Sequence, residues 1–224
     1  MKGTYSDWAQ SYAALGLRVF PIAPGKKSPP MVTDWPQKAT TEATQVKRWW
    51  KGTPDANIAV ATGSGSGIVD IETDAKGAVS GEETLAEYAA ANLFEIPKTW
   101  SFRSGSGGIH RLFRNDSPNI GNRAGALPAV DVRGAGGYAI FPPSLHPNGE
   151  RYEWLPGCSP EDMPSGPAEL PFELFCLITE NALGNGQPLE VPKEIPEGGR
   201  NDTLFRLACK LRRAGLCEAE ILGA

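Results

Sequence analysis

Two acidic side chains interrupt a stretch that otherwise has the composition of a buried β-strand. They are Asp70 and Glu72, within the run IVDIE at residues 68–72. Side chains alternate between the faces of a strand, so these two carboxylates are expected on one face, about 6.6 Å apart. Like charges this close are costly to bury unless a cation or a proton neutralises them. Carboxylate oxygens suit Mg²⁺ or Mn²⁺, so the pair is a candidate metal site; the alternative is two solvated acids at the edge of a sheet.

A third acid and a glycine-rich segment extend this pattern. Asp131 lies in a second apolar run, VDVR at 130–133, and supplies a third carboxylate. In the segment SGSGGIH at 104–110, small residues leave the backbone N–H groups accessible, and a histidine adds a side-chain donor. We therefore interpret this segment as a candidate phosphate-binding turn. Its members are Ser104, Ser106, Gly107, Gly108 and His110.

Arginines surround these segments. Five arginines and only two aspartates lie between residues 103 and 133, although the whole chain has a formal charge of −4. Arg103, Arg114 and Arg133 are candidate contacts to a triphosphate or a template; the alternative for each is a solvated surface position. A locally basic stretch beside an acidic one suits a polyanionic ligand that binds partly through cations.

Three acids and a phosphate-binding turn fit nucleotidyl transfer with two metal ions. Two other classes stay open. A metal-dependent nuclease or phosphodiesterase could use the same acids to activate water, and a non-catalytic module could bind nucleic acid on a sheet through aromatic side chains. The sequence lacks a G-x-S-x-G motif, and the spacing of its four cysteines does not suit a zinc site.

The elements that must position these residues alternate without a repeat. Apolar periodicity and turn residues predict helices at 4–15, 41–51, 82–92 and 169–180, and strands at 17–22, 57–62, 68–72, 99–102, 109–113, 130–132 and 138–141. The last two strands are expected to pair through the glycine-rich residues 133–137. Many strands with few, separated helices predict an α+β domain with a mixed or antiparallel sheet.

Two basic segments have open interpretations. The loop PGKKSPP at 24–30 carries Lys26 and Lys27, which are either solvated or in contact with phosphate or template. The helix at 41–51 places Lys47, Arg48 and Lys51 beside Trp49 and Trp50. Such an arrangement can bind single strands, or the tryptophans can simply pack the helix onto a sheet.

Residue patterns also predict the domain limits. We expect a catalytic domain at 1–181, a linker rich in proline and glycine at 182–199, and the beginning of a second, helical domain at 200–224. No apolar run approaches the length of a membrane span, and the N-terminus lacks the apolar core of a signal peptide. The prediction is a cytoplasmic protein without a membrane partner.

The order of the motifs resembles one known family. The sequences DIE, SGSGGIH, VDVRGAGGY and FPPS, after the opening ALGLRVFPIAPGKKSP, are similar to the bifunctional DNA primase/polymerase domain of phage and plasmid replication proteins. This domain is a branch of the archaeo-eukaryotic primase superfamily, and the resemblance covers about residues 5–180. The run GGRN at 198–201 resembles the start of a primase C-terminal helical domain.

The resemblance implies a fold, a reaction and roles for residues. The fold would be an RRM-like catalytic core, in which Asp70, Glu72 and Asp131 bind Mg²⁺ or Mn²⁺ and His110 contacts the incoming nucleotide. The reaction would be primer synthesis and extension from NTPs or dNTPs on a single-stranded DNA template, with a helicase in the same polypeptide or replisome. Many members of the superfamily have serine two places before the histidine, where this chain has Gly108.

Overall fold

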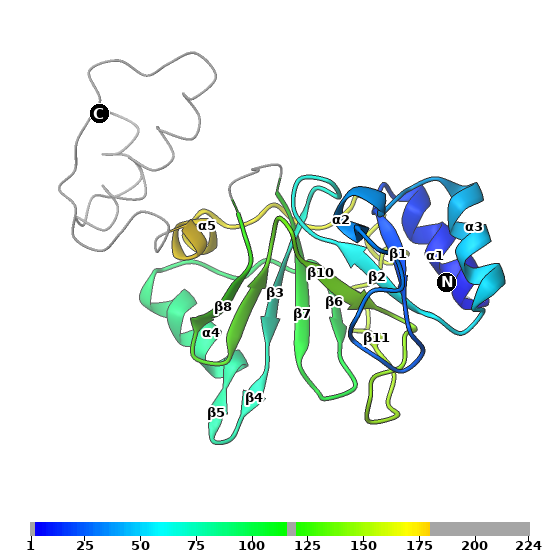
Figure 1. The fold of residues 1–224 in the computed structure, drawn as a ribbon. Helices are drawn as coiled ribbons and strands as arrows, with labels where there is room; N and C mark the ends of the chain where they lie inside the picture. Colours follow the sequence, from blue (N-terminus) through cyan, green and yellow to red (C-terminus); the bar gives the residue numbers. More distant parts are fainter. Residues whose placement is uncertain (1–2, 116–119, 180–224) are drawn as a thin grey trace, which may run out of the picture. The chain divides into compact units, whose positions relative to one another are not determined.

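The computed structural model describes residues 3–115 and 120–179, which form parts of two compact units, Met1–Pro171 and Phe172–Ala224 (Figure 1). Within the second unit it describes one helix, α5 (Phe172–Thr179). The predicted linker at 182–199 and helical segment at 200–224 lie outside the described residues. The predicted domain limits, including that at residue 181, stay predictions.

The larger sheet of the first unit holds six strands in the order β11-β6-β7-β3-β9-β8. These are β3 (Ile68–Thr73), β6 (Trp100–Arg103), β7 (Ile109–Arg114), β8 (Arg123–Leu127), β9 (Val130–Arg133) and β11 (Glu153–Trp154). Each neighbouring pair runs antiparallel. The strand that carries Asp70 and Glu72 therefore lies inside the sheet, between β7 and β9.

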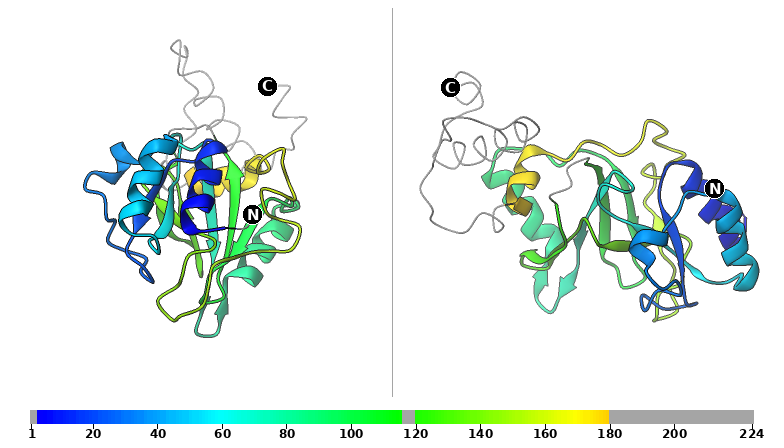
Figure 2. Two further views of the ribbon diagram at one scale, coloured as in Figure 1. Left: turned by 90° about the vertical axis from the view of Figure 1, so that its right-hand side faces the viewer. Right: turned by 45° about the horizontal axis from the view of Figure 1, so that its top comes forward.

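The smaller sheet holds three antiparallel strands in the order β1-β2-β10, namely β1 (Val19–Ile22), β2 (Asn57–Ala61) and β10 (Tyr138–Phe141). Helices α1 (Tyr5–Ala14) and α3 (Ala43–Gly52) pack against this sheet and each other, and Figures 1 and 2 show both away from the larger sheet. A short helix, α2 (Trp35–Lys38), precedes α3. A capping box between Thr4 and Asp7 fixes the start of α1.

The two faces of the larger sheet have different partners. On β3, Val69 and Ile71 point to the face that helix α4 (Gly81–Ala91) contacts, and a hairpin of β4 (Ala75–Lys76) and β5 (Val79–Ser80) leads from β3 into this helix. The opposite face carries Phe102, whose ring lies 5.1 Å from that of Phe141 on β10. The smaller sheet thus packs against the face that carries Asp70 and Glu72.

The α+β class and the antiparallel sheets are confirmed, but one predicted pairing is wrong. Residues 130–132 and 138–141 were expected to form a hairpin, whereas β9 pairs with β3 and β10 pairs with β2. The glycine-rich residues 133–137 carry the chain from one sheet to the other. In the part of the chain that the structure describes, no helix is long and apolar enough to span a bilayer.

Candidate active site

Three carboxylates predicted as metal ligands lie on one face of the larger sheet. Glu72 on β3 is directly opposite Asp131 on β9, and Asp70 is two residues before Glu72 on the same face. The side chain of Asp70 is completely buried, and Glu72 and Asp131 are each 9 % exposed. A two-residue period on β3 and an antiparallel register with β9 therefore bring together acids that are about 60 residues apart in the chain.

His110 lies on the other side of Glu72 from Asp131. It is directly opposite Glu72 in the pairing of β3 with β7, and its Nδ1 is 2.7 Å from Oδ2 of Asp70. Its Nε2 is 3.8 Å from Oε1 of Glu72, and its ring stacks on Phe102 with centroids 4.6 Å apart. Burial lowers the pKa of His110, but the charge and hydrogen bond of Asp70, followed by the charge of Glu72, outweigh burial and raise that pKa.

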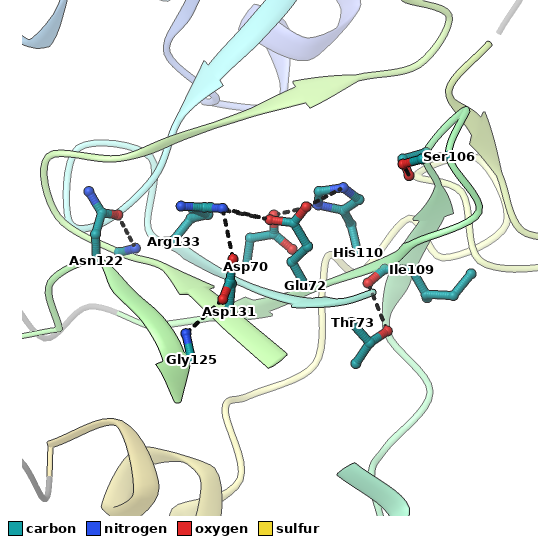
Figure 3. Close-up of polar contacts among 12 residues, drawn as sticks. Asp70, Glu72, Thr73, Ser106, Ile109, His110, Asn122, Gly125, Asp131 and Arg133 are labelled. Atoms are coloured by element: carbon teal, nitrogen blue, oxygen red, sulfur yellow. Dashed lines mark hydrogen bonds and ion pairs between the residues drawn. The ribbon is translucent and has the colours of Figure 1, made fainter. Parts of the chain in front are cut away.

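Arg133 joins two of the three carboxylates. Its Nη2 is 3.0 Å from Oε2 of Glu72 and 3.3 Å from Oδ2 of Asp131, and Figure 3 shows the guanidinium group across the two acids. Oδ1 of Asp131 also accepts a hydrogen bond from the Gly125 backbone N–H at 2.7 Å. Burial lowers the pKa of Arg133, whereas Glu72 above all raises it, so that the net pKa is raised. A permanent positive charge therefore lies where the sequence predicted a metal ion.

The donor types of the site fit a divalent cation. Oδ1 of Asp70 is buried and has no hydrogen-bond partner, which is an arrangement that proteins avoid unless an ion or water completes it. As the described side chains stand, however, no three His, Cys, Asp or Glu residues converge closely enough to bind a metal ion. Arg133 contacts two of the three acids, so metal binding by all three requires its guanidinium group to move.

A cavity of about 320 Å³ opens over this cluster. The larger sheet contributes Glu72, His110 and Arg133, and the smaller sheet contributes residues 138–140 of β10. Lys27 and Ser28 also line the cavity, from the loop after β1; other lining residues are Asn122, Gly136, Gly137 and Tyr152. The cavity thus has the Glu72 carboxylate on one wall and a lysine on another, and its volume is that of a small-molecule site.

Close backbone approaches fix the connection that brings the two sheets together. A Cβ atom at Gly134 would lie 2.2 Å from the carbonyl oxygen of Ile120, and one at Gly137 would lie 2.0 Å from Oδ1 of Asn122. The Gly134 backbone also donates to Asn122 and accepts from the Thr62 hydroxyl. A side chain at Gly134, directly after Arg133, would therefore overlap neighbouring backbone, whereas one at Gly137 would have to displace the side chain of Asn122.

The predicted phosphate-binding turn forms the tip of the β6–β7 hairpin. The Ser104 hydroxyl lies 3.0 Å from that of Ser106, and the backbone N–H of Ser104 donates to the carbonyl of Gly108. A Cβ atom at Gly108 would lie 2.4 Å from Oδ1 of Asp74, so this glycine permits close packing, while Gly107 has a positive φ of 95°. None of these four residues lines the cavity, and Figure 3 shows Ser106 away from the acids. His110 is the member of the predicted turn that the structure brings to the carboxylates.

Of the three arginines predicted to contact a triphosphate or a template, the structure brings one to the carboxylates. Arg133 lies among the carboxylates. Arg103 is opposite Ile109, one residue out of phase with His110, so its side chain belongs to the other face of the sheet. Arg114 donates to Glu169 at 2.7 Å, four residues along β7 from His110.

Sequence reasoning did not assign several residues of the cavity. Lys27 was recognised only as a loop lysine with two open interpretations, and its charge lies near enough to lower the pKa of His110. Tyr138, Tyr152 and Asn122 have no local signal, because packing of two sheets brings them to the site. Ser28 could have been predicted as a cavity residue only through Lys27, its neighbour in the loop.

Comparisons with known protein families identify two matching sequence models. The sequence model of the family described as "Bifunctional DNA primase/polymerase, N-terminal" matches residues 9–172, a range that contains all three acids and His110. The model described as "Primase C terminal 1 (PriCT-1)" matches residues 189–223. A search of curated proteins gave no significant match. With most of its length matched by the first model, the chain belongs to the bifunctional DNA primase/polymerase family.

Proposed function

We propose that the protein synthesises primers de novo and extends them on a single-stranded DNA template by nucleotidyl transfer. The observation that carries this proposal is the register of three strands, which places Glu72 between His110 on β7 and Asp131 on β9, with Asp70 on the same face. Family membership supports the same reaction class and implies DNA and nucleotides as substrates.

Asp70, Glu72 and Asp131 are the residues that would hold Mg²⁺ or Mn²⁺. When bound, such ions activate the attacking 3′ hydroxyl and neutralise charge on the triphosphate. The unpartnered oxygen of Asp70 and the oxygen-only donor set support this assignment. Occupancy by two ions is part of the proposal.

The remaining polar residues of the cavity would orient the nucleotide. Asp70 holds Nδ1 of His110, which leaves Nε2 to donate to a phosphate oxygen when the ring is protonated. Arg133 and Lys27 provide positive charge on two walls of the cavity. Once its guanidinium group leaves Glu72 and Asp131, Arg133 can pair with the triphosphate, so that one cation replaces another at the carboxylates.

The test is template-directed synthesis on unprimed single-stranded DNA with labelled nucleotides and Mn²⁺. Wild type should produce labelled products complementary to the template. Asp70→Asn and Asp131→Asn should each abolish these products, because each variant removes one negatively charged metal ligand without changing side-chain size. Asp162→Asn, which alters a surface aspartate, is the matched control. Shortening of the template instead of synthesis would favour a nuclease. DNA binding without any chemistry would favour a non-catalytic module.

A further inference from the structure

A second cavity, of about 520 Å³, lies on the smaller-sheet side of the unit. Its lining residues are Pro21 of β1, Met31 and Val32 of the following loop, Lys38 of α2, and Gln45 and Trp49 of α3. None of these residues lines the cavity over the carboxylates. The second cavity has the volume of a site for a small ligand or a nucleobase.

Two neighbouring tryptophans of α3 have different environments. Trp50 is buried, and its Nε1 donates to the carbonyl of Ala56 at 2.9 Å, so it belongs to the core. Trp49 is only partly buried and lines the cavity together with Met31, which is 46 % exposed. An indole and a methionine at a hollow in the surface form an apolar site of the kind on which a planar base stacks.

The surroundings of this cavity are basic. Lys38 is part of the wall, and α3 exposes Lys47, Arg48 and Lys51. Between residues 34 and 51 the acids are Asp34 and Glu42, so these four cations exceed the acids by two in a chain of net charge −4. Asp34 is 3.9 Å from Lys38 in an exposed pair, which neutralises the lysine weakly. An aromatic side chain with surrounding cations is the usual combination for binding single-stranded nucleic acid.

The loop after β1 connects the two cavities. Lys27 and Ser28 line the first cavity, and Met31 and Val32 line the second. Ser28 and Met31 are three residues apart, so their Cα atoms are separated by at most about 10 Å, a length of a few nucleotides. Trp35, at the start of α2, also contacts Tyr138 of the first cavity, with ring centroids 5.1 Å apart. One strand of nucleic acid could therefore reach both cavities.

We propose that this second cavity binds a base of the single-stranded template, stacked on Trp49, while Lys38 and the cations of α3 contact the adjacent phosphates. This inference rests on the proposed function and adds to it a template contact outside the carboxylate cluster. The segments next to the smaller sheet would then contribute to both substrates, the loop after β1 through Lys27 for the nucleotide and α3 through Trp49 for the template.

The experiment measures the affinity of a fluorescent single-stranded oligonucleotide by anisotropy, without nucleotide or divalent metal. Trp49→Ala should bind about tenfold more weakly, since stacking on one aromatic side chain contributes about 1–3 kcal/mol. Trp49→Phe should retain most of the affinity. Lys38→Glu should weaken binding and reduce its salt dependence, whereas Lys98→Glu, an exposed lysine that lines neither cavity, should have a smaller effect.

Photo-crosslinking of wild type to an oligonucleotide that contains 5-iodouracil provides a second readout that needs no variant. The expected adduct lies in peptides that contain Met31 or Trp49. Equal affinity of Trp49→Ala and wild type, adducts confined to other segments, or no binding by wild type would each overturn the inference. Equal affinity with template-directed synthesis intact would overturn only this inference. Binding that depends on Trp49 in a protein that incorporates no nucleotide would support this inference and contradict the proposed function.

Discussion

Replacing Arg133 should make the carboxylate site bind metal more tightly. The Arg133 Nη2 lies 3.0 Å from Glu72 and 3.3 Å from Asp131, and the two acids are 11 % and 12 % exposed at the side chain. At an effective dielectric constant of about 20, each ion pair has a gross attraction of about 5 kcal/mol at these distances. Desolvation and the 34 % exposure of the Arg133 side chain reduce the net value for both pairs to about 2 kcal/mol.

A divalent cation that binds all three acids must first displace this guanidinium group. Arg133→Met keeps much of the side-chain volume and removes the charge, so we expect Mn²⁺ to bind about 10- to 30-fold more tightly in the absence of nucleotide. Without metal, the same variant should lose about 2 kcal/mol of unfolding free energy at pH 7, because Glu72 and Asp131 then face each other without a counter-ion. Added Mn²⁺ should recover most of this loss.

Titration of Mn²⁺ by electron paramagnetic resonance measures the affinity, and urea unfolding with and without Mn²⁺ measures the stability. Arg48→Met, which removes an exposed arginine on α3, is the matched control and should change neither value. Unchanged or weaker Mn²⁺ binding by Arg133→Met would refute the reasoning. The guanidinium group would then not occupy the place of a metal ion.

Three further predictions concern single side chains. His110→Ala should weaken nucleotide binding about tenfold, by isothermal titration, and leave metal binding largely intact, since it removes a charged donor and no metal ligand. Burial raises the pKa of Glu82, but hydrogen bonds from Arg111 and Thr73 lower it by more than burial raises it. The net pKa of Glu82 is therefore below the ordinary value. Its stabilising effect is therefore present at neutral pH and lost as the pH falls through the folded-state pKa. Glu82→Gln should cost about 0.5 kcal/mol at pH 7, and urea unfolding should show this cost shrinking as the pH is lowered into the acid range. Thr4→Ala removes the cap of α1 and should cost about 1 kcal/mol, by thermal unfolding; no loss would show that the cap is dispensable.

Much of the secondary structure could be predicted because its signals are local. The two-residue period at residues 68–72 placed both acids on one face of a strand, which β3 confirms. Periodicity and capping residues likewise located α1, α3 and α4 to within a few residues. Short elements without an apolar pattern were not predicted, and these are α2, β4, β5, β8 and β11.

The features of the fold and the site that were not predicted from the sequence depend on which segments meet in space. The glycines at 133–137 have the composition of a hairpin turn, and no local signal distinguishes a turn from a crossover between two sheets. For the same reason Lys27 and Tyr138 could not be assigned to the cavity, since they reach it from the loop after β1 and from β10. Arg133 was predicted as a contact to a triphosphate or a template, with a solvated position as the alternative, but its pairing with Glu72 and Asp131 follows only from the register of β3 with β9.

The most direct test of the central claim is a crystal structure with Mn²⁺ and a non-hydrolysable nucleotide, with the ions located by anomalous scattering. The claim predicts a peak about 2.2 Å from carboxylate oxygens of Asp70, Glu72 and Asp131, with the guanidinium group of Arg133 turned toward the phosphates. A peak away from these acids, or an Arg133 still paired with Glu72 and Asp131 beneath a bound nucleotide, would contradict it.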